Sequence, residues 1–99
     1  MLNSTQRKFL RGRAHKLKPT VMVGQKGFSP ELVAATDSAL ADHELIKIKF
    51  NEFKEKEGKQ TICQALTEAT QSEMAGMIGH TAILYRAQAD PEKRKIRLP

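Results

Sequence analysis

Cysteine, tryptophan and long apolar runs are scarce or missing in this sequence, and each absence narrows what the chain can be. The one cysteine, Cys63, excludes an intrachain disulfide and a zinc site built from several thiolates, so we expect a reduced, cytoplasmic setting. Residues 1–18 are polar and basic and contain no unbroken apolar segment, which argues against a signal peptide or a membrane span. We therefore expect a soluble protein without a membrane partner.

Acidic residues are missing from the first 27 positions, which hold seven basic residues. Residues 28–79 have nine acidic and five basic side chains, and residues 80–99 have five basic and two acidic ones, which together give the net charge of +6. An ordinary solvated surface mixes its signs, whereas segregated charge indicates a polyanionic partner. Nucleic acid is the first candidate and an acidic membrane surface the second.

Motifs of catalysis are also absent. The chain has no Walker-type Gly-Lys-Ser/Thr sequence and no pattern that pairs a nucleophile with a base. Its three histidines, His15, His43 and His80, are far apart in the sequence and lack the spacing of metal ligands. We expect no enzyme activity, no cofactor and no metal site.

Hydrophobic periodicity predicts seven elements in the order α-β-α-β-α-β-β. The first helix is expected to have Ser4 or Thr5 as its cap and to run to about Leu17. Two further helices are expected over 30–43 and over 60–70, and strands over 20–23, 45–50, 73–78 and 81–86. The 99 residues suit a single domain. This order predicts a compact α/β sandwich with helices packed on a four-stranded mixed sheet.

A Gly-x-x-Gly loop joins the first predicted strand to the second helix. Gly24 and Gly27 can adopt positive φ and approach a ligand closely, and Lys26 supplies a cation between them. Ser29 and Pro30 then suit the cap and first turn of a helix, whose free amides would lie beside the loop. The pattern fits a phosphate-binding loop and, equally well, a tight turn with an ordinary cap.

The first predicted helix combines an apolar side with a basic one. At 100° per residue, Leu10, Ala14 and Leu17 share one side, and the neighbouring strip is formed by Arg7, Arg11, His15 and Lys18. Gly12 costs this helix about 1 kcal/mol relative to alanine, or else marks a close backbone contact.

Later segments have weaker patterns. Residues 45–50 alternate, which places Lys47 and Lys49 together on a wet face, whereas 51–59 is charged and indicates a connection or a frayed helix start. Gly76 predicts a bulge or a close approach, and Gly79 a tight turn between the last two strands. Residues 87–99 fit a short edge strand or a basic tail.

Several segments, in this order and spacing, resemble the CRM domain family (chloroplast RNA splicing and ribosome maturation), in particular its stand-alone bacterial YhbY-type proteins. The matching segments are Ser4 to His15, Leu17 to Pro19, Val21 to Phe28, His43 to Lys49, Ile78 to His80, Leu84 to Arg86 and Lys95 to Pro99. The resemblance spans nearly the whole chain. It implies an RNA-binding domain similar in fold to the C-terminal domain of a bacterial translation initiation factor, associated with precursors of the large ribosomal subunit.

The resemblance also implies where RNA is held. The expected contacts are Gly24, Gln25, Lys26 and Gly27 in the loop, with Arg7, Arg11 and Lys18 extending a basic track that Arg86, Lys93 and Arg94 lengthen. Phe28 either stacks on a base or packs as a hydrophobic staple. The expected state is a monomer bound to ribosomal RNA; the alternatives are a structural ribosomal protein and an enzyme that binds a phosphorylated ligand at the loop.

Overall fold

The computed structural model describes all residues, 1–99. Its elements are α1 (Ser4–Ala14), β1 (Val21–Val23), α2 (Pro30–His43), β2 (Leu45–Phe50), α3 (Lys56–Thr70), β3 (Glu73–Ile78), β4 (Thr81–Tyr85) and a short 3-10 helix, η1 (Pro91–Lys93). The predicted order of elements and the α/β class are therefore confirmed.

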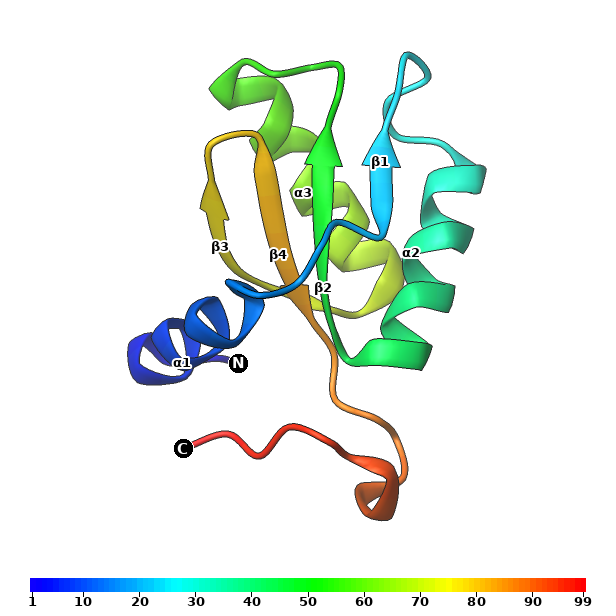
Figure 1. Ribbon diagram of the computed structural model, residues 1–99. Helices are drawn as coiled ribbons and strands as arrows, with labels where there is room; N and C mark the ends of the chain where they lie inside the picture. Colours follow the sequence, from blue (N-terminus) through cyan, green and yellow to red (C-terminus); the bar gives the residue numbers. More distant parts are fainter.

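The four strands form one mixed sheet in the order β1-β2-β4-β3 (Figure 1). Strands β1 and β2 are parallel, whereas β4 is antiparallel to both β2 and β3. The parallel pair places the loops that follow β1 and β2 at the same end of the sheet. The turn between β3 and β4 reaches that end as well (Figure 1).

One face of the sheet is covered by α2 and α3. Their apolar sides meet the strands in a cluster of 12 buried residues, which includes Phe50, Leu40 and Leu66. In α2, Leu32, Thr36 and Leu40 are buried, the spacing expected for one side of a helix. This face forms the larger part of the core.

The opposite face is only partly covered. A second cluster of eight buried residues joins α1 and the C-terminal segment to β2, β3 and β4, with Leu10, Ala14, Ile83 and Tyr85 among its members. The chain after α1 crosses in front of β4 and β2 to reach β1 (Figure 1). The part of this face next to the strand-end loops has no helix over it.

Helix α1 begins and ends earlier than predicted. Asn3, and not Ser4 or Thr5, is its cap: the Asn3 side chain accepts from the amide of Gln6 at 2.8 Å, and the Gln6 side chain accepts from the amide of Asn3 at 3.1 Å. The helix ends at Ala14, so Leu17 lies outside it and is 39% exposed. The chain must leave the helix here because it has to cross the sheet to β1.

Helix α3 begins at Lys56, four residues before the predicted start at 60. Of the charged residues 51–59, for which a connection and a frayed helix start were both expected, the last four form its first turn. Lys59 is almost fully buried, and its Nζ donates to the carbonyl oxygen of Gly79 at 2.8 Å and lies 3.2 Å from His80 Nδ1. The lysine thus ties α3 to the turn between β3 and β4, a contact that no local pattern indicates.

The predicted irregularities in the last two strands are confirmed. Pairing of β3 with β4 shifts register between Met74 and Gly76, as expected for a bulge. Gly79 has a φ of +59° in the turn, a value that favours glycine.

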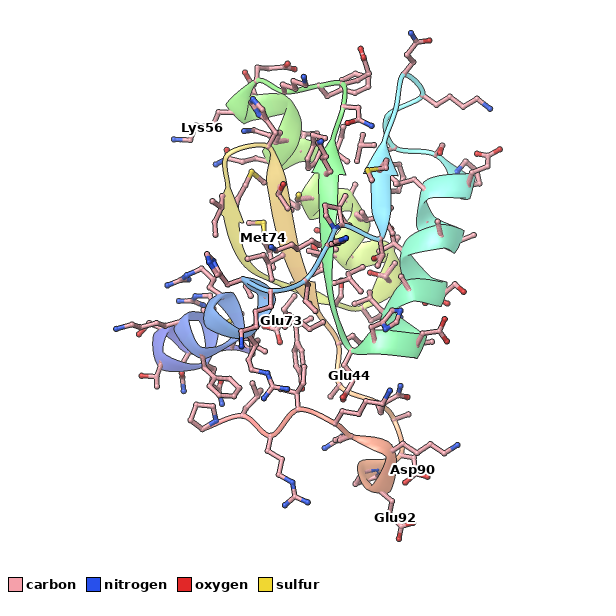
Figure 2. All side chains as sticks on the ribbon, viewed as in Figure 1. Glu44, Lys56, Glu73, Met74, Asp90 and Glu92 are labelled. Atoms are coloured by element: carbon pink, nitrogen blue, oxygen red, sulfur yellow. The ribbon has the colours of Figure 1, made fainter.

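The C-terminal segment departs from both expected forms, because it is neither an edge strand nor a free tail. Ile96 is buried, and the segment is held by Glu44, which is completely buried at the end of α2 (Figure 2). Its carboxylate accepts from the amides of Gln88 at 3.1 Å, Lys95 at 2.6 Å and Ile96 at 3.2 Å. The chain then returns to α1, where the side chain of Gln6 donates to the carbonyl oxygen of the last residue at 3.3 Å.

Candidate nucleic-acid interface

The loop after β1 is a tight turn. The amide of Gly27 donates to the carbonyl oxygen of Gly24 at 3.0 Å, and Gly27 has a φ of +62°. Ser29 caps α2 with its side chain, as the sequence predicts. Gln25 and Lys26 are exposed at the tip, whereas Gly27 is buried. The turn therefore exposes the side chains of Gln25 and Lys26 at its tip, while the buried Gly27 holds the turn in place.

Phe53 imposes a second constraint on Gly27. A Cβ at Gly27 would lie 3.0 Å from Cε2 and 3.1 Å from Cζ of the Phe53 ring, closer than carbon atoms usually pack. Phe53 has a φ of +56°, which is strained for a bulky residue, and it is 39% exposed. Phe28, next to Gly27 in the chain, is 46% exposed. Two partly exposed aromatic side chains thus belong to this end of the molecule, of which the sequence pointed only to Phe28.

A cleft of about 330 Å³ lies between the turn and the start of α2. Its lining includes all four residues of the turn together with Met22, Ser29, Glu31 and Leu32. The strand, the turn and the helix start thus enclose a space beside Lys26, as the strand-loop-helix pattern predicts.

A row of side chains crosses the uncovered part of the sheet. In the strand register, Met22 of β1 is opposite Lys49 of β2, Lys49 is opposite Thr81 of β4, and Thr81 is opposite Ile78 of β3. We call these four residues the open row. Met22 and Ile78 are 51% and 58% exposed, Lys49 is exposed, and the row contains no acid. Since opposite residues point to one face, the row joins the cleft beside the turn to the far edge of the sheet.

A groove of about 300 Å³ borders the open row on the side of α1. Its lining is basic and apolar without an acid: Arg11, His15, Pro19, Lys47, Ile78, Thr81 and Ile83. Lys47 Nζ donates to the carbonyl oxygen of Leu17 at 3.0 Å, and Lys18 is exposed in the same crossing segment. Strand alternation predicted a wet face with Lys47 and Lys49, but only the sheet order shows that this face borders both the turn and α1.

Arg7 and Arg11 each use part of their guanidinium to hold α1 in place. Arg7 donates to the carbonyl oxygen of Leu2 at 2.8 Å, and Arg11 to that of Ala75 at 3.1 Å. A Cβ at Gly76 would lie 2.5 Å from Arg11 Cδ, so the lack of a side chain at Gly76 makes room for Arg11. A guanidinium has five N–H donors, so both arginines keep donors for a ligand.

Three further predicted site residues lie away from the turn. Arg86 donates to the carboxylate of Asp37 at 2.6 Å and to the carbonyl oxygen of Thr70 at 2.9 Å, which ties the end of β4 to α2 and α3. Lys93 and Arg94 belong to the segment around η1, at the end of the molecule opposite the turn (Figure 1). Arg94 also donates its Nε to a backbone carbonyl of that segment at 2.8 Å. The structure does not bring these three cations to the Gly24–Gly27 turn.

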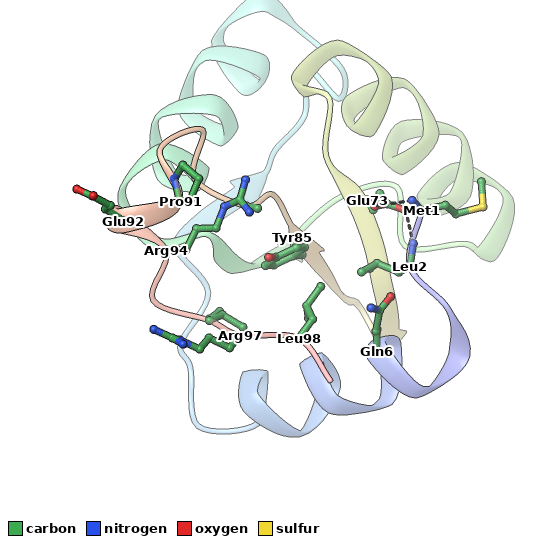
Figure 3. A pocket seen from close by; sticks show the side chains of 12 residues that line it. Met1, Leu2, Gln6, Glu73, Tyr85, Pro91, Glu92, Arg94, Arg97 and Leu98 are labelled. Atoms are coloured by element: carbon green, nitrogen blue, oxygen red, sulfur yellow. Dashed lines mark hydrogen bonds and ion pairs between the residues drawn. The ribbon is translucent and has the colours of Figure 1, made fainter.

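A cavity of about 600 Å³ lies between the C-terminal segment and the start of α1 (Figure 3). Glu73 and Glu92 line it together with Arg94 and Arg97, around the ring of Tyr85. Burial is the main cause that raises the pKa of the Tyr85 hydroxyl above 10.0. Because both signs of charge meet here, this cavity does not favour a polyanion.

Cys63 is a packing residue. It is 2% exposed, and burial raises the pKa of its thiol from 9.0 to about 11, so it carries no thiolate near neutral pH. The structure contains no group of three or more His, Cys, Asp or Glu side chains that could hold a metal ion. None of its helices has the length and apolar character that crossing a membrane requires.

The fold and the turn first define a class: a small α/β domain whose first strand ends in a Gly-x-x-Gly turn that leads directly into a capped helix. The family model described as the CRS1 / YhbY (CRM) domain matches residues 2–86. The chain belongs to the CRM domain family, which confirms the resemblance found in its sequence.

Relatives match over nearly their whole length. An RNA-binding protein of Haemophilus influenzae is 40% identical over 98 residues, which cover 99% of this chain and 95% of the relative. The Probable RNA-binding protein YqeI of Bacillus subtilis is 34% identical over 99 residues and covers 100% of both chains. The solution structure of the hypothetical protein SAV1595 from Staphylococcus aureus is similar to this fold with a TM-score of 0.83 and 30% identity, over 100% of both chains.

Proposed function

We propose that this chain is an RNA-binding protein that holds RNA by its backbone and associates with precursors of the large ribosomal subunit. The observation that carries the proposal is the acid-free open row, which joins the Gly24–Gly27 turn to the basic groove beside α1. The names of the relatives in Haemophilus influenzae and Bacillus subtilis support RNA as the partner. The link to ribosome precursors rests on the resemblance to the stand-alone YhbY-type proteins.

The proposed contacts follow the charge along this surface. Lys26 and Gln25 bind one phosphate of the RNA at the turn. The RNA strand then follows Lys49, Lys47 and Lys18 across the uncovered part of the sheet toward α1. Each neutralised phosphate releases condensed counterions, so binding weakens steeply as salt rises. Contacts of this kind position the RNA without reading its sequence.

The proposed interface keeps seven of the residues expected from the sequence and adds two. It contains Gly24, Gln25, Lys26, Gly27, Arg7, Arg11 and Lys18, with Lys47 and Lys49 added. Gly27 contributes by supporting the turn. Arg86, Lys93 and Arg94 are left outside, because the charge of Arg86 is paired with Asp37 and the other two lie at the opposite end. The protein acts as a monomer in the cytoplasm and has no catalytic role.

A salt titration tests the interface. Lys26→Ala should weaken binding to a labelled RNA hairpin and reduce the slope of log affinity against log salt by about one unit. Lys93→Ala is the matched control, because it removes the same charge at the opposite end of the molecule. Equal losses for both variants would reject the turn as a specific phosphate contact and favour diffuse attraction.

Sedimentation tests the cellular role. An assembly factor should sediment in sucrose gradients with precursors of the large subunit and be absent from mature subunits. A structural ribosomal protein, which would use the same basic surface, should instead stay with the mature particle. Recovery in the mature fraction would therefore replace the first role by the second while leaving RNA binding intact.

A further inference from the structure

Gly12 occupies a position in α1 where the protein itself has no need of glycine. Its φ is not positive, so any residue can adopt its backbone conformation. A Cβ added there meets no atom within 4 Å, so no neighbour in the fold excludes a side chain. Glycine is nevertheless the poorest helix former after proline. The close contact that its presence in the sequence suggested does not occur within the chain.

The surroundings of Gly12 are basic. At 100° per residue it lies on the side of α1 opposite the buried Leu10 and Ala14. A shallow cleft of about 820 Å³ runs along this outer side. Helix α1 itself lies at the edge of the molecule (Figure 1). Its lining contains three cations and no acid: Thr5, Lys8, Phe9, Gly12, Arg13, Lys16 and Pro99.

The cations are arranged around the glycine. Lys8 precedes Gly12 by one helical turn, and Lys16 follows it by the same number of residues just beyond the helix. The guanidinium carbon of Arg13 lies 5.8 Å from the centroid of the Phe9 ring, a cation–π contact that holds the cation beside Phe9. A negatively charged chain laid along this side would meet positive charge before, beside and after the position that lacks a side chain.

We propose that Gly12 is a point of close approach for an RNA backbone, with Lys8, Arg13 and Lys16 as its phosphate contacts. The inference rests on the proposed function and adds a second contact area on the outer side of α1, away from the sheet. The missing Cβ lets a phosphate or ribose touch the helix backbone between the cations. Charge decides in favour of RNA over an apolar protein helix, because no acid lines the cleft and none occurs in the first 27 residues.

Gly12→Ala tests this inference through two effects of opposite sign. The free protein should melt about 4–8 °C higher, because alanine is the better helix former and finds open space. Binding to a fluorescein-labelled RNA hairpin, measured by anisotropy, should weaken by about tenfold, because the added methyl group holds the backbone away. Gly12→Leu should weaken binding further.

Two controls separate the possible outcomes. Ala69→Leu adds bulk to an exposed position of α3 and should leave RNA binding unchanged. Lys26→Ala reports on the turn independently. If Lys26→Ala weakens binding while Gly12→Ala only raises the melting temperature, the contact at Gly12 is rejected and the proposed function stands. A lower melting temperature for Gly12→Ala would also overturn the inference, because the glycine would then serve the fold.

Discussion

The two faces of the sheet are covered to different extents. On one face, α2 and α3 form a cluster of 12 buried residues with the strands. On the other, α1 and the C-terminal segment bury eight residues and stop short of the open row. A sheet that was covered equally on both faces would bury more apolar surface and gain stability, but it would have no flat, basic face for a ligand. Stability and binding are thus assigned to opposite sides of the same four strands.

Replacing one buried leucine on each face by alanine should have the largest effect, and it tests whether the two faces contribute unequally to stability. Leu66 in α3 and Leu10 in α1 are both 0% exposed and both helical, so their alanine variants match in chemistry. Leu66→Ala should cost about 3–5 kcal/mol and Leu10→Ala about 2–3 kcal/mol in the free energy of unfolding, because α1 borders the uncovered face and can settle into the cavity. Urea unfolding measures both values, and a larger cost at Leu10 would contradict the unequal division of stability.

Glu44→Gln should have the second-largest effect on the free energy of unfolding. The carboxylate oxygens of Glu44 accept hydrogen bonds from three backbone amides of the C-terminal segment. The NH2 group of a glutamine would instead point a donor toward one or more of these N–H groups. We expect a loss of about 1–3 kcal/mol in the free energy of unfolding and faster hydrogen exchange at Lys95 and Ile96. Glu68→Gln, an exposed change of the same charge, is the control. Unchanged exchange would mean that apolar packing alone holds the segment.

Lys49→Gln tests whether the uncovered face of the sheet binds RNA. It should lower the salt slope of RNA binding by about one unit and leave stability within about 0.5 kcal/mol of the original. Lys56→Gln removes an exposed charge from α3 and should change the slope less. If both variants lower it equally, binding depends on net charge and not on the open row.

The last prediction concerns the rate at which the thiol of Cys63 is alkylated. Its pKa is about 11 in the folded protein against 9.0 for the free thiol, so burial favours the neutral form. The stability that this shift represents is present below pH 9 and is lost as the pH rises toward 11. At pH 8 the rise of the Cys63 pKa from 9.0 to about 11 lowers the fraction of thiolate. Alkylation by iodoacetamide should therefore be about a hundredfold slower than in the unfolded protein. Alkylation at equal rates would show that the covered face opens readily.

Elements with strong local patterns could be predicted from the sequence. Helix α2 has its cap at Ser29 and a proline at its first position, and β2 alternates apolar and basic residues from Ile46 to Phe50, so the predicted bounds agree with the structure. The start of α3 could not be predicted, because Lys59 is buried through partners about 20 residues away in the chain. Local charge indicated a loop where tertiary contacts stabilise a helix.

Distant contacts also limited what could be predicted of the site. The turn was recognisable because glycine, lysine and the helix cap are adjacent in the chain. The open row was not, because its four residues come from four strands and their order in the sheet follows from packing. Arg86 shows the converse: its charge suggested a ligand contact, but its partner Asp37 is 49 residues away and accepts from it within the fold.

The bond from Gln6 to the last carbonyl has a consequence for the connectivity of the chain. It brings the two termini together beside α1, while the turn at Gly79 and His80 lies exposed at the other end of the sheet. A circular permutant could therefore join residue 99 to residue 1 by a short linker and begin at His80. Every strand would keep its neighbours in such a protein, although β3 and β4, now consecutive, would become its last and first strands.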